Sequence, residues 1–488
     1  MPGVKGGSST LRPIMRSVTG VSTTLGALGL ALAIAAPSAN GGGFTTTRFG
    51  GEHGHAATSD VTATFYNPAG LANGHGTRVY AEGLFAYRTV DYNRNAAAID
   101  DAGGGTPTAG GGILANSGKA TLANAVVSPF VGFATDAGIR GLGLGFSLSV
   151  PFGGQASWDK VSQFEGNTDF PGAVDSSARW ASIEGSQRSV YFTLAGAWRT
   201  SDGKFGFGAG VNLVQSEISL VRARNFDGSD DLVQADGTTI KEGRALLDVK
   251  ARELAASVGL MWKPTACSRI GVSYHSQPGF GESTLEGTLT TQLGATAPGT
   301  VDIELRQSLP DSIRIGGEWR GLEKVTFHVA LDYQRWSLFK NQCIVNPGAP
   351  ESACAANDDG LIEQSSEVSA NIVRAWKDTY GVRVGGTYHL SDSLELNGGL
   401  LYDSNAVPDR TLDPALMDMD KLIPQLGVRY LAGNVLISAT LGHVLYFSRT
   451  TAPRAVDPDP ADKNRSPDMA GDYKQSVSYL LLGVGIGI

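Results

Sequence analysis

The stretch Val325-Thr-Phe-His-Val-Ala-Leu-Asp-Tyr-Gln334 decides the fold class, because its apolar and polar residues alternate one by one. One parity carries Val325, Phe327, Val329, Leu331 and Tyr333, and the other carries Thr326, His328, Ala330, Asp332 and Gln334. Successive side chains of a β-strand point to opposite faces, so a period of two separates the two sets. The stretch therefore predicts a strand with one apolar face and one small or polar face.

The same alternation recurs along the chain, for example at 188–198, Trp376–Tyr388 and Leu480–Ile488. We count about fourteen such strands between residues 77 and 488. The connections alternate between short turns, such as Gly321-Leu-Glu-Lys324, and long loops, such as 341–371. This asymmetry is typical of an outer-membrane β-barrel, and a soluble sandwich has no reason for it. Since the number of strands is even, both barrel ends are expected on the short-turn, periplasmic side.

Aromatic residues stand just before six of the short turns: Phe133, Trp198, Trp262, Trp319, Tyr388 and Tyr430. Amphipathic rings prefer the boundary between lipid and water. The repetition predicts an aromatic girdle at one membrane interface, although aromatic residues at the ends of core strands are the alternative.

Composition excludes several classes of protein. The chain has 488 residues, of which 65 are Gly and 18% are charged. Beyond residue 40 no apolar run approaches the roughly 18–20 residues that a membrane helix needs, so a helical membrane protein is excluded. Residues 1–40 combine a basic start, an apolar run and small residues, which is the pattern of a secretory signal peptide. Without the three bases of that segment, 36 Lys and Arg face 47 Asp and Glu, a poor balance for binding nucleic acid.

Three cysteines are too few for a disulfide framework in a chain of this length. Cys343 and Cys354 flank a stretch of loop composition, and in an oxidising compartment they can pair. Paired and unpaired states both remain open, and Cys267 is left over in either case.

Residues 41–76 precede the first strand and do not alternate like the rest. They are rich in aromatic residues, whereas a disordered tail usually is not. Fourteen strands also enclose a lumen wide enough to need filling. We therefore expect a plug, or hatch, at 41–76 with Phe44 and Phe49 as apolar contacts, followed by a barrel over 77–488.

Within the expected plug, Phe65-Tyr-Asn-Pro-Ala-Gly-Leu-Ala72 resembles the hatch motif of the FadL/TodX family of outer-membrane transporters for hydrophobic compounds. Further stretches resemble that family in the same order along the chain, among them Leu142–Gly153, Gly206–Asn212, Leu309–Gly316, Asp378–Gly386 and Tyr402–Asp409. The resemblance covers nearly the whole mature chain. It implies a 14-stranded barrel, plugged by an N-terminal hatch, in the outer membrane.

The resemblance also implies residue roles. Asn67, Pro68 and Ala69 correspond to the hatch motif, and substrate is expected to leave sideways beside a kinked third strand. Gly141, Gly143, Gly145, Pro151 and Gly153 are the candidates for that kink, because Pro lacks a ladder donor and Gly has no side chain to pack. Ordinary use of Gly in a barrel explains the glycines nearly as well. Arg383 and Arg429 have lumen parity, where they would attract a carboxylate or pair with lumen carboxylates.

No catalytic constellation, cofactor motif or nucleic-acid motif is found in the sequence, so an enzyme is not expected. His53 and His55 are read as polar plug residues rather than metal ligands, and no metal is assigned. The expected function is passive uptake of hydrophobic compounds, such as fatty acids, by a monomer that contacts outer-membrane lipid and is inserted by the barrel-assembly machinery. A general diffusion porin and a surface protein that binds partners through its loops are the alternatives.

Overall fold

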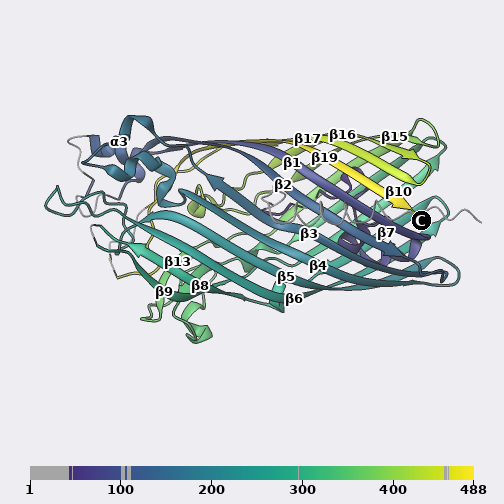
Figure 1. The fold of residues 1–488 in the computed structure, drawn as a ribbon, viewed down its shortest axis with the longest axis horizontal. Helices are drawn as coiled ribbons and strands as arrows, with labels where there is room; N and C mark the ends of the chain where they lie inside the picture. The colour runs from purple at the N-terminus through teal and green to yellow at the C-terminus, as the bar shows by residue number, and fades with distance from the viewer. Residues whose placement is uncertain are drawn as a thin grey trace, which may run out of the picture.

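The computed structural model describes residues 43–46, 48–100, 105–106, 111–294, 296–454, 459 and 461–487. The expected signal peptide, residues 1–40, and residues 41, 42 and 47 of the expected hatch lie outside these ranges. In the described part, one antiparallel sheet closes on itself as β1 pairs with β19 from Arg78 opposite Gly487 to Arg94 opposite Gly471. The result is a long barrel (Figure 1).

The barrel is built from nineteen strand segments. In chain order they are β1 Thr77–Arg94, β2 Gly118–Thr135, β3 Leu142–Ser157, β4 Glu184–Arg199, β5 Phe205–Arg224, β6 Gly243–Thr265, β7 Ser268–His275, β8 Ser283–Gln292, β9 Gly299–Gln307, β10 Ser312–Leu322, β11 Val325–Gln334, β12 Asn341–Val345, β13 Val368–Val373, β14 Thr379–His389, β15 Leu394–Asp403, β16 Lys421–Ala432, β17 Val435–Tyr446, β18 Arg449–Thr450 and β19 Gly471–Gly487. Five spans consist of two segments each (β7 with β8, β9 with β10, β11 with β12, β13 with β14, β17 with β18). The barrel therefore has fourteen spans, which confirms the predicted fold class.

Short helical turns occupy the hatch and the loops. They are η1 Gly51–His53, α2 Ala63–Tyr66, η2 Pro68–Asn73, η3 Ala96–Ala98, α3 Gly112–Asn116, η5 Ser162–Phe164, η6 Pro171–Asp175, η7 Ser177–Trp180, η8 Pro278–Phe280, η9 Trp336–Leu338, η10 Glu351–Cys354 and η11 Asp409–Thr411. Among the described residues, no helix has the length and apolar character to cross a membrane.

Four neighbouring spans are interrupted at one level, where the sequence predicts continuous strands. His275, Ser312, Gln334 and Thr379 form one row of the ladder, and the interruptions begin directly beyond that row. The alternation predicts continuous strands at 269–288, 300–319, 325–340 and 374–389, and these predictions are wrong at this level. At these interruptions, aromatic side chains from both alternating sets of residues lie in the lumen.

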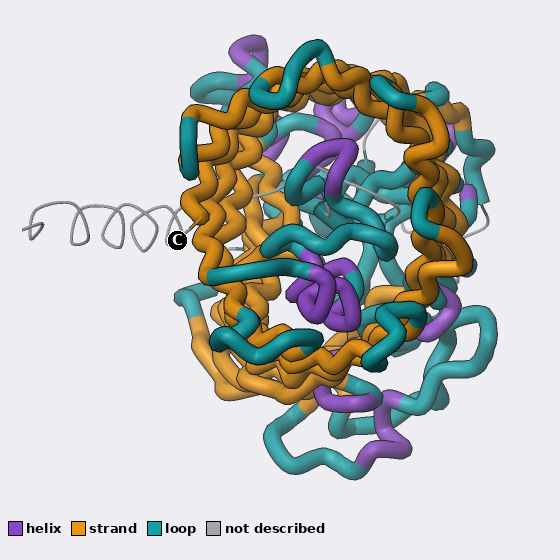
Figure 2. Tube along the Cα trace, turned by 90° about the vertical axis from the view of Figure 1, so that its right-hand side faces the viewer, coloured by secondary structure: helices purple, strands orange, loops and turns teal. Residues whose placement is uncertain are grey.

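The outward faces are apolar, and all six predicted girdle residues are exposed, from 40% for Phe133 to 54% for Trp198. Short turns gather at the end of the barrel where β19 ends, and the larger loops lie at the opposite end (Figure 1). Residues 43–46 and 48–76 precede β1 and contribute the helical turns η1, α2 and η2 that lie inside the barrel. Figure 2, viewed from the short-turn end, shows helical turns and loops filling the lumen.

Glycines on the inner face of the barrel let the hatch approach closely. A Cβ at Gly208 would overlap the backbone of Ala69, and one at Gly259 would overlap the side chain of Asn67. Gly143 and Gly271 stand equally close to Leu71 and Ala56. These inward glycines therefore serve hatch packing.

Candidate ligand-binding lumen and lateral opening

The aromatic ring of Phe44 lies in a cluster of rings within the lumen. Its centroid is 4.9 Å from that of Trp336, 5.9 Å from that of Trp376 and 6.1 Å from that of Phe152. Trp336 and Phe339 are fully buried, and Trp376 is 4% exposed. These three residues lie where the spans are interrupted, in or next to η9 and in the segment before β14. The backbone is not extended there, so side chains of both parities point inward. Phe44 was predicted from the sequence as an apolar contact of the hatch, but the cluster of rings around it was not predicted.

A cavity adjoins the ring of Phe44. Its free volume is about 80 Å³, and its lining includes Phe44, Arg88, Gln155, Leu220, Leu247, Leu305, Gln342, Ile372, Arg374, Trp376, Leu416 and Met417. For comparison, an enclosed apolar cavity of ~150 Å³ binds benzene. The cavity as it stands is therefore too small for a single-ring molecule, and a larger ligand has to displace part of its wall. Phe44 is a candidate for displacement, because it comes from the hatch segment rather than from a strand of the barrel.

Two buried arginines give this apolar cavity a cationic side. Arg88 donates from Nε to Gln475 Oε1 at 2.9 Å and from a terminal nitrogen to the carbonyl of Gln155 at 3.2 Å. Arg374 donates to Gln342 Oε1 at 2.7 and 2.9 Å and pairs with Asp413 at 2.7 Å. Among the described residues Arg88 has no carboxylate partner, so its charge is met only by neutral oxygens. A buried charge is costly unless it is paired, which favours an anionic ligand here.

The wall of the barrel opens between β2 and β3. Their ladder holds only from Phe130 opposite Ser149 to Thr135 opposite Leu144, although β2 continues back to Gly118 and remains paired with β1. On its other side β3 follows β4, with an irregularity between Ser149 and Phe152. Side chains reach across the gap instead, because Asn124 and Arg88 both donate to the carbonyl of Gln155 at 3.2 Å.

The hatch segment occupies part of the ladder edge of β3 that β2 leaves free. The N–H of Thr46 donates to the carbonyl of Pro151 at 2.6 Å, and the N–H of Gly153 donates to the carbonyl of Phe44 at 3.1 Å. The Thr46 hydroxyl also donates to the carbonyl of Val150. Phe44 therefore places its ring in the cavity, and the backbones of Phe44 and Thr46 pair with the irregular part of β3.

The expected hatch motif lies at the contact between hatch and wall. Asn67 is fully buried, donates from Nδ2 to the carbonyls of Ala56 at 2.7 Å and Leu260 at 3.0 Å, and accepts the N–H of Ala69 at 3.1 Å. Pro68 begins η2, where its missing N–H is not needed. Phe49 packs on Phe65 and Phe130, with centroids 5.4 and 5.1 Å away.

The other predicted site residues have mixed positions. Gly143 and Gly145 face the hatch, and Gly141 has a positive φ of 82° in the turn before β3. Arg383 donates to the hatch carbonyls of Gly51 at 3.3 Å and Gly54 at 2.6 Å. Arg429 lies 3.1 Å from His53 Nδ1 and 3.2 Å from Glu395. Both arginines therefore contact the hatch and do not line the cavity beside Phe44, and their carboxylate-attracting role stays a prediction.

The arginines that do line the cavity were not singled out from the sequence. Arg88 follows Tyr80, Glu82 and Ala86 on the inward parity of β1, so parity alone would have placed it in the lumen. Arg374 lies in the interruption between β13 and β14, where no period applies.

His55, Glu318 and His328 come close enough to suggest a metal site, with ligand atoms within 4.8 Å of one another. However, His55 Nδ1 accepts the N–H of Ala57 at 3.1 Å, so Nε2 carries the proton and donates to His328 Nδ1 at 2.9 Å. Burial lowers the pKa of His55 well below its ordinary value, in keeping with a neutral ring. Glu318 already pairs with Arg269 at 2.7 Å and Arg320 at 2.8 Å. These groups satisfy one another, and we assign no metal to them.

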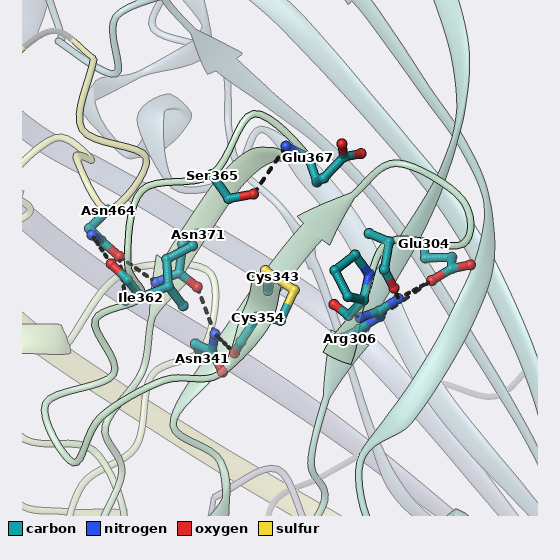
Figure 3. The surroundings of a disulfide bond; sticks show 12 residues. Glu304, Arg306, Asn341, Cys343, Cys354, Ile362, Ser365, Glu367, Asn371 and Asn464 are labelled. Atoms are coloured by element: carbon teal, nitrogen blue, oxygen red, sulfur yellow. Dashed lines mark hydrogen bonds and ion pairs between the residues drawn. A yellow bond between two sulfur atoms is a disulfide. The ribbon is translucent and has the colours of Figure 1, made fainter. Parts of the chain in front are cut away.

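A disulfide joins Cys343 on β12 to Cys354 on η10 in the large extracellular loop (Figure 3). Its neighbours form a polar network, in which Asn341 donates to Asn371 Oδ1 at 2.8 Å and Asn371 donates to Asn464 Oδ1 at 2.8 Å. The bond therefore fastens a loop that is also tied to the segment before β19. Cys267 is free and exposed.

Comparison with known proteins agrees with this geometry. The sequence matches the family described as outer membrane protein transport protein (OMPP1/FadL/TodX) over residues 21–437. It is 24% identical over 307 residues to outer membrane protein P1 of Haemophilus influenzae, which covers 59% of each chain. It is 21% identical over 261 residues to the long-chain fatty acid transport protein of Salmonella typhi, covering 50% of this chain and 55% of that protein. The matched stretch thus spans less than two thirds of the length of both relatives.

Solved structures share the fold at low sequence identity. A Pseudomonas aeruginosa FadL homologue superposes with a TM-score of 0.71 at 16% identity, covering 93% of this chain and all of that one. The toluene transporter TodX of Pseudomonas putida superposes with a TM-score of 0.59 at 15% identity, covering 92% and 99%.

Proposed function

Because the chain belongs to the OMPP1/FadL/TodX family of outer-membrane transport proteins, we propose that it takes up amphiphiles with an anionic head and a long apolar chain, such as long-chain fatty acids. The family as a whole transports hydrophobic compounds across the outer membrane. The proposal is narrower, because it requires the substrate to carry an anionic head. It rests on one observation, the buried Arg88 in the lining of the cavity, whose charge is met only by neutral oxygens among the described residues. Relatives named for toluene transport make neutral aromatic compounds the main competing substrate class.

The proposed path follows the geometry of the lumen. A ligand enters from the loop end and places its carboxylate near Arg88 and Arg374. Its chain needs more than the free volume of about 80 Å³, so it displaces the ring of Phe44. Moving Phe44 pulls on Thr46 and weakens the bonds to Pro151 and Val150. The ligand then leaves between β2 and β3 into lipid without crossing bulk water.

In this proposal the barrel acts as a monomer. The barrel-assembly machinery inserts it into the outer membrane, and the substrate leaves it into outer-membrane lipid. The filled lumen supports gated uptake over a general diffusion porin.

The test compares a fatty acid with the alcohol of the same chain length, in competition with a fluorescent fatty acid for purified protein. We expect the acid to compete at least tenfold better in the wild type, and Arg88→Gln to abolish that preference. Arg454→Gln serves as the control, because Arg454 is a partly exposed loop cation that does not line the cavity. If the alcohol or toluene competes as well as the acid in the wild type, the anionic head is wrong while hydrophobic transport stands.

A further inference from the structure

A second group of cations lies on the outside of the barrel, where it faces lipid. The outward residues of β4, β5 and β6 are apolar from the short-turn end up to Val190, Leu213 and Leu254. The next outward positions toward the loop end carry Gln215 and Arg252, which lie opposite each other in the ladder. The outward polar residues therefore begin in one row on β5 and β6 and in the next row on β4, at Arg188, as expected near the outer edge of the apolar belt.

Three cations gather at this edge. Arg188 on β4, Glu217 on β5 and Lys250 on β6 form one row of the ladder, with Arg252 directly below that row. Glu217 accepts from Arg188 at 2.6 Å and from Lys250 at 3.2 Å. Lys250 also stands opposite Glu286 of β8. Arg252 is exposed and makes no ion pair or hydrogen bond that the described residues provide.

These cations border a groove with an apolar floor. The groove has a volume of about 330 Å³, and Leu148, Val190 and Phe192 line it together with Arg188, Lys250 and Arg252. The outward faces of other strands carry exposed tyrosines, among them Tyr87, Tyr274, Tyr333 and Tyr380. Tyrosine is a usual residue at the membrane interface, and the groove has Arg and Lys in its lining and no tyrosine.

We infer that the groove binds the phosphorylated head of a saccharolipid of the outer leaflet, with an acyl chain on Leu148, Val190 and Phe192. The head of such a lipid lies at the outer edge of the apolar belt, and its phosphates are the anions available there. Arg pairs with phosphate through two parallel hydrogen bonds, and Arg252 offers an unused guanidinium for this purpose. Exposed ion pairs contribute little to stability, so a phosphate can share Arg188 with Glu217 at small cost. Among the residues that line the groove, three cations, Arg188, Lys250 and Arg252, face one carboxylate, Glu217, so the lining is positive and complements a phosphate.

The site lies beside the proposed exit without being part of it. Leu148 is on β3, two residues before Val150, where the irregular part of β3 begins. The groove faces lipid on the β4 side of that strand, whereas the opening is on the β2 side. The inference therefore does not depend on which ligand the lumen carries.

The experiment measures the lipid that stays with the protein. Wild type and variants are extracted from cells with their surrounding lipid in copolymer discs, transferred to mild detergent, and analysed by native mass spectrometry. We expect about one phosphorylated saccharolipid per wild-type chain, and at least a fivefold lower occupancy in Arg188→Gln/Arg252→Gln. The matched control is Lys119→Gln, which removes an exposed cation at the loop end of β2, away from the groove. Arg252→Lys keeps the positive charge but loses the planar guanidinium that can donate two parallel hydrogen bonds to a phosphate. We expect its lipid occupancy to lie between that of the wild type and that of the double variant.

Equal occupancy in wild type and the double variant would overturn the inference, as would an equal loss in Lys119→Gln. A competition arm identifies the lipid, because added phosphatidylglycerol should displace the retained saccharolipid at least tenfold less well than added bisphosphorylated lipid A. Equal displacement would overturn the assignment to a saccharolipid. Heat-modified migration on gels shows that the variants are folded, and the single variant Arg252→Gln repeats the test with the ion pair of Arg188 and Glu217 intact.

Discussion

The N–H of Thr46, in the hatch, donates to the carbonyl of Pro151, in the irregular part of β3, at 2.6 Å. This bond occupies a ladder position that β2 would otherwise use, and it lies two residues from the ring in the ligand cavity. It thus joins the proposed ligand cavity to the gap in the ladder between β2 and β3.

Thr46→Pro removes the donor of this bond without removing the hatch. Proline has no N–H, so the carbonyl of Pro151 loses its partner and the edge of β3 is freed. We expect faster release of bound hydrophobic dye into vesicles, by roughly tenfold, with little change in barrel melting. Thr46→Ser keeps both the N–H and the hydroxyl and should behave like the wild type. A release rate unchanged by the proline would separate the hatch segment from the exit.

Phe44→Ala tests whether the ring occupies the space that a ligand needs. Removing the ring enlarges the cavity, so a ligand no longer has to displace Phe44 before binding. We expect fatty-acid affinity to rise about tenfold, equivalent to ~1.4 kcal/mol. Uptake should fall at the same time, because binding no longer pulls on Thr46. Fluorescent fatty-acid titration and vesicle uptake measure the two effects, and a weaker affinity in Phe44→Ala would contradict this role.

Asn67→Ala should loosen the hatch. The change deprives the buried carbonyls of Ala56 and Leu260 of a donor, and leaving a buried polar group unsatisfied costs about 1–3 kcal/mol. Hydrogen exchange of residues 51–73 should accelerate by one to two orders of magnitude, while the strands stay protected. Asn73→Ala is the matched control in the same segment, because the Asn73 side chain makes only one long hydrogen bond among the described residues, which it accepts from Arg199 at 3.4 Å. Equal protection in the two variants would show that Asn67 does not fasten the hatch.

Removing the disulfide should affect the loop and leave the barrel unchanged. A cross-link that closes a short loop stabilises it by about 3 kcal/mol through the unfolded state. In Cys343→Ser/Cys354→Ser we therefore expect limited proteolysis within 346–367 to be at least tenfold faster, at unchanged barrel melting. Cys267→Ser removes the exposed free thiol and should change neither quantity. A fall in barrel melting in the double variant would mean that the loop supports the wall.

The sequence predicted the parts of this protein that follow a period. Alternation such as that of Val325–Gln334 gave the strands, the inward faces and the girdle, because one side must meet lipid and the other the lumen. It failed at Trp336 and Trp376, where neighbouring spans break at one level and side chains of both parities turn inward. It also could not reveal that Arg88 lacks a carboxylate partner, or that Phe44 lies beside β3, because both depend on contacts between distant segments.

The connection between β3 and β4, residues 158–183, which we call the loop cap, should loosen in acid. Glu242 accepts from Arg179 at 3.0 Å and Arg244 at 2.6 Å, and Asp175 pairs with Arg244 at 2.5 Å and with Lys160. Burial would raise the pKa of Glu242 and Asp175, but these cations outweigh it and hold both below their ordinary values of 4.5 and 3.8. A carboxyl with a lowered pKa in the folded state contributes stability that is complete above its unfolded pKa and is lost as pH falls through its folded pKa.

Proteolysis of residues 159–182 by an acid-active protease should therefore accelerate below about pH 4.5. Glu242→Gln should raise the rate at neutral pH and flatten its dependence on pH, whereas Glu165→Gln, in an exposed turn of the same loop, should leave the profile unchanged. A wild-type rate that stays level from pH 7 to pH 3 would show that these ion pairs do not hold the cap closed.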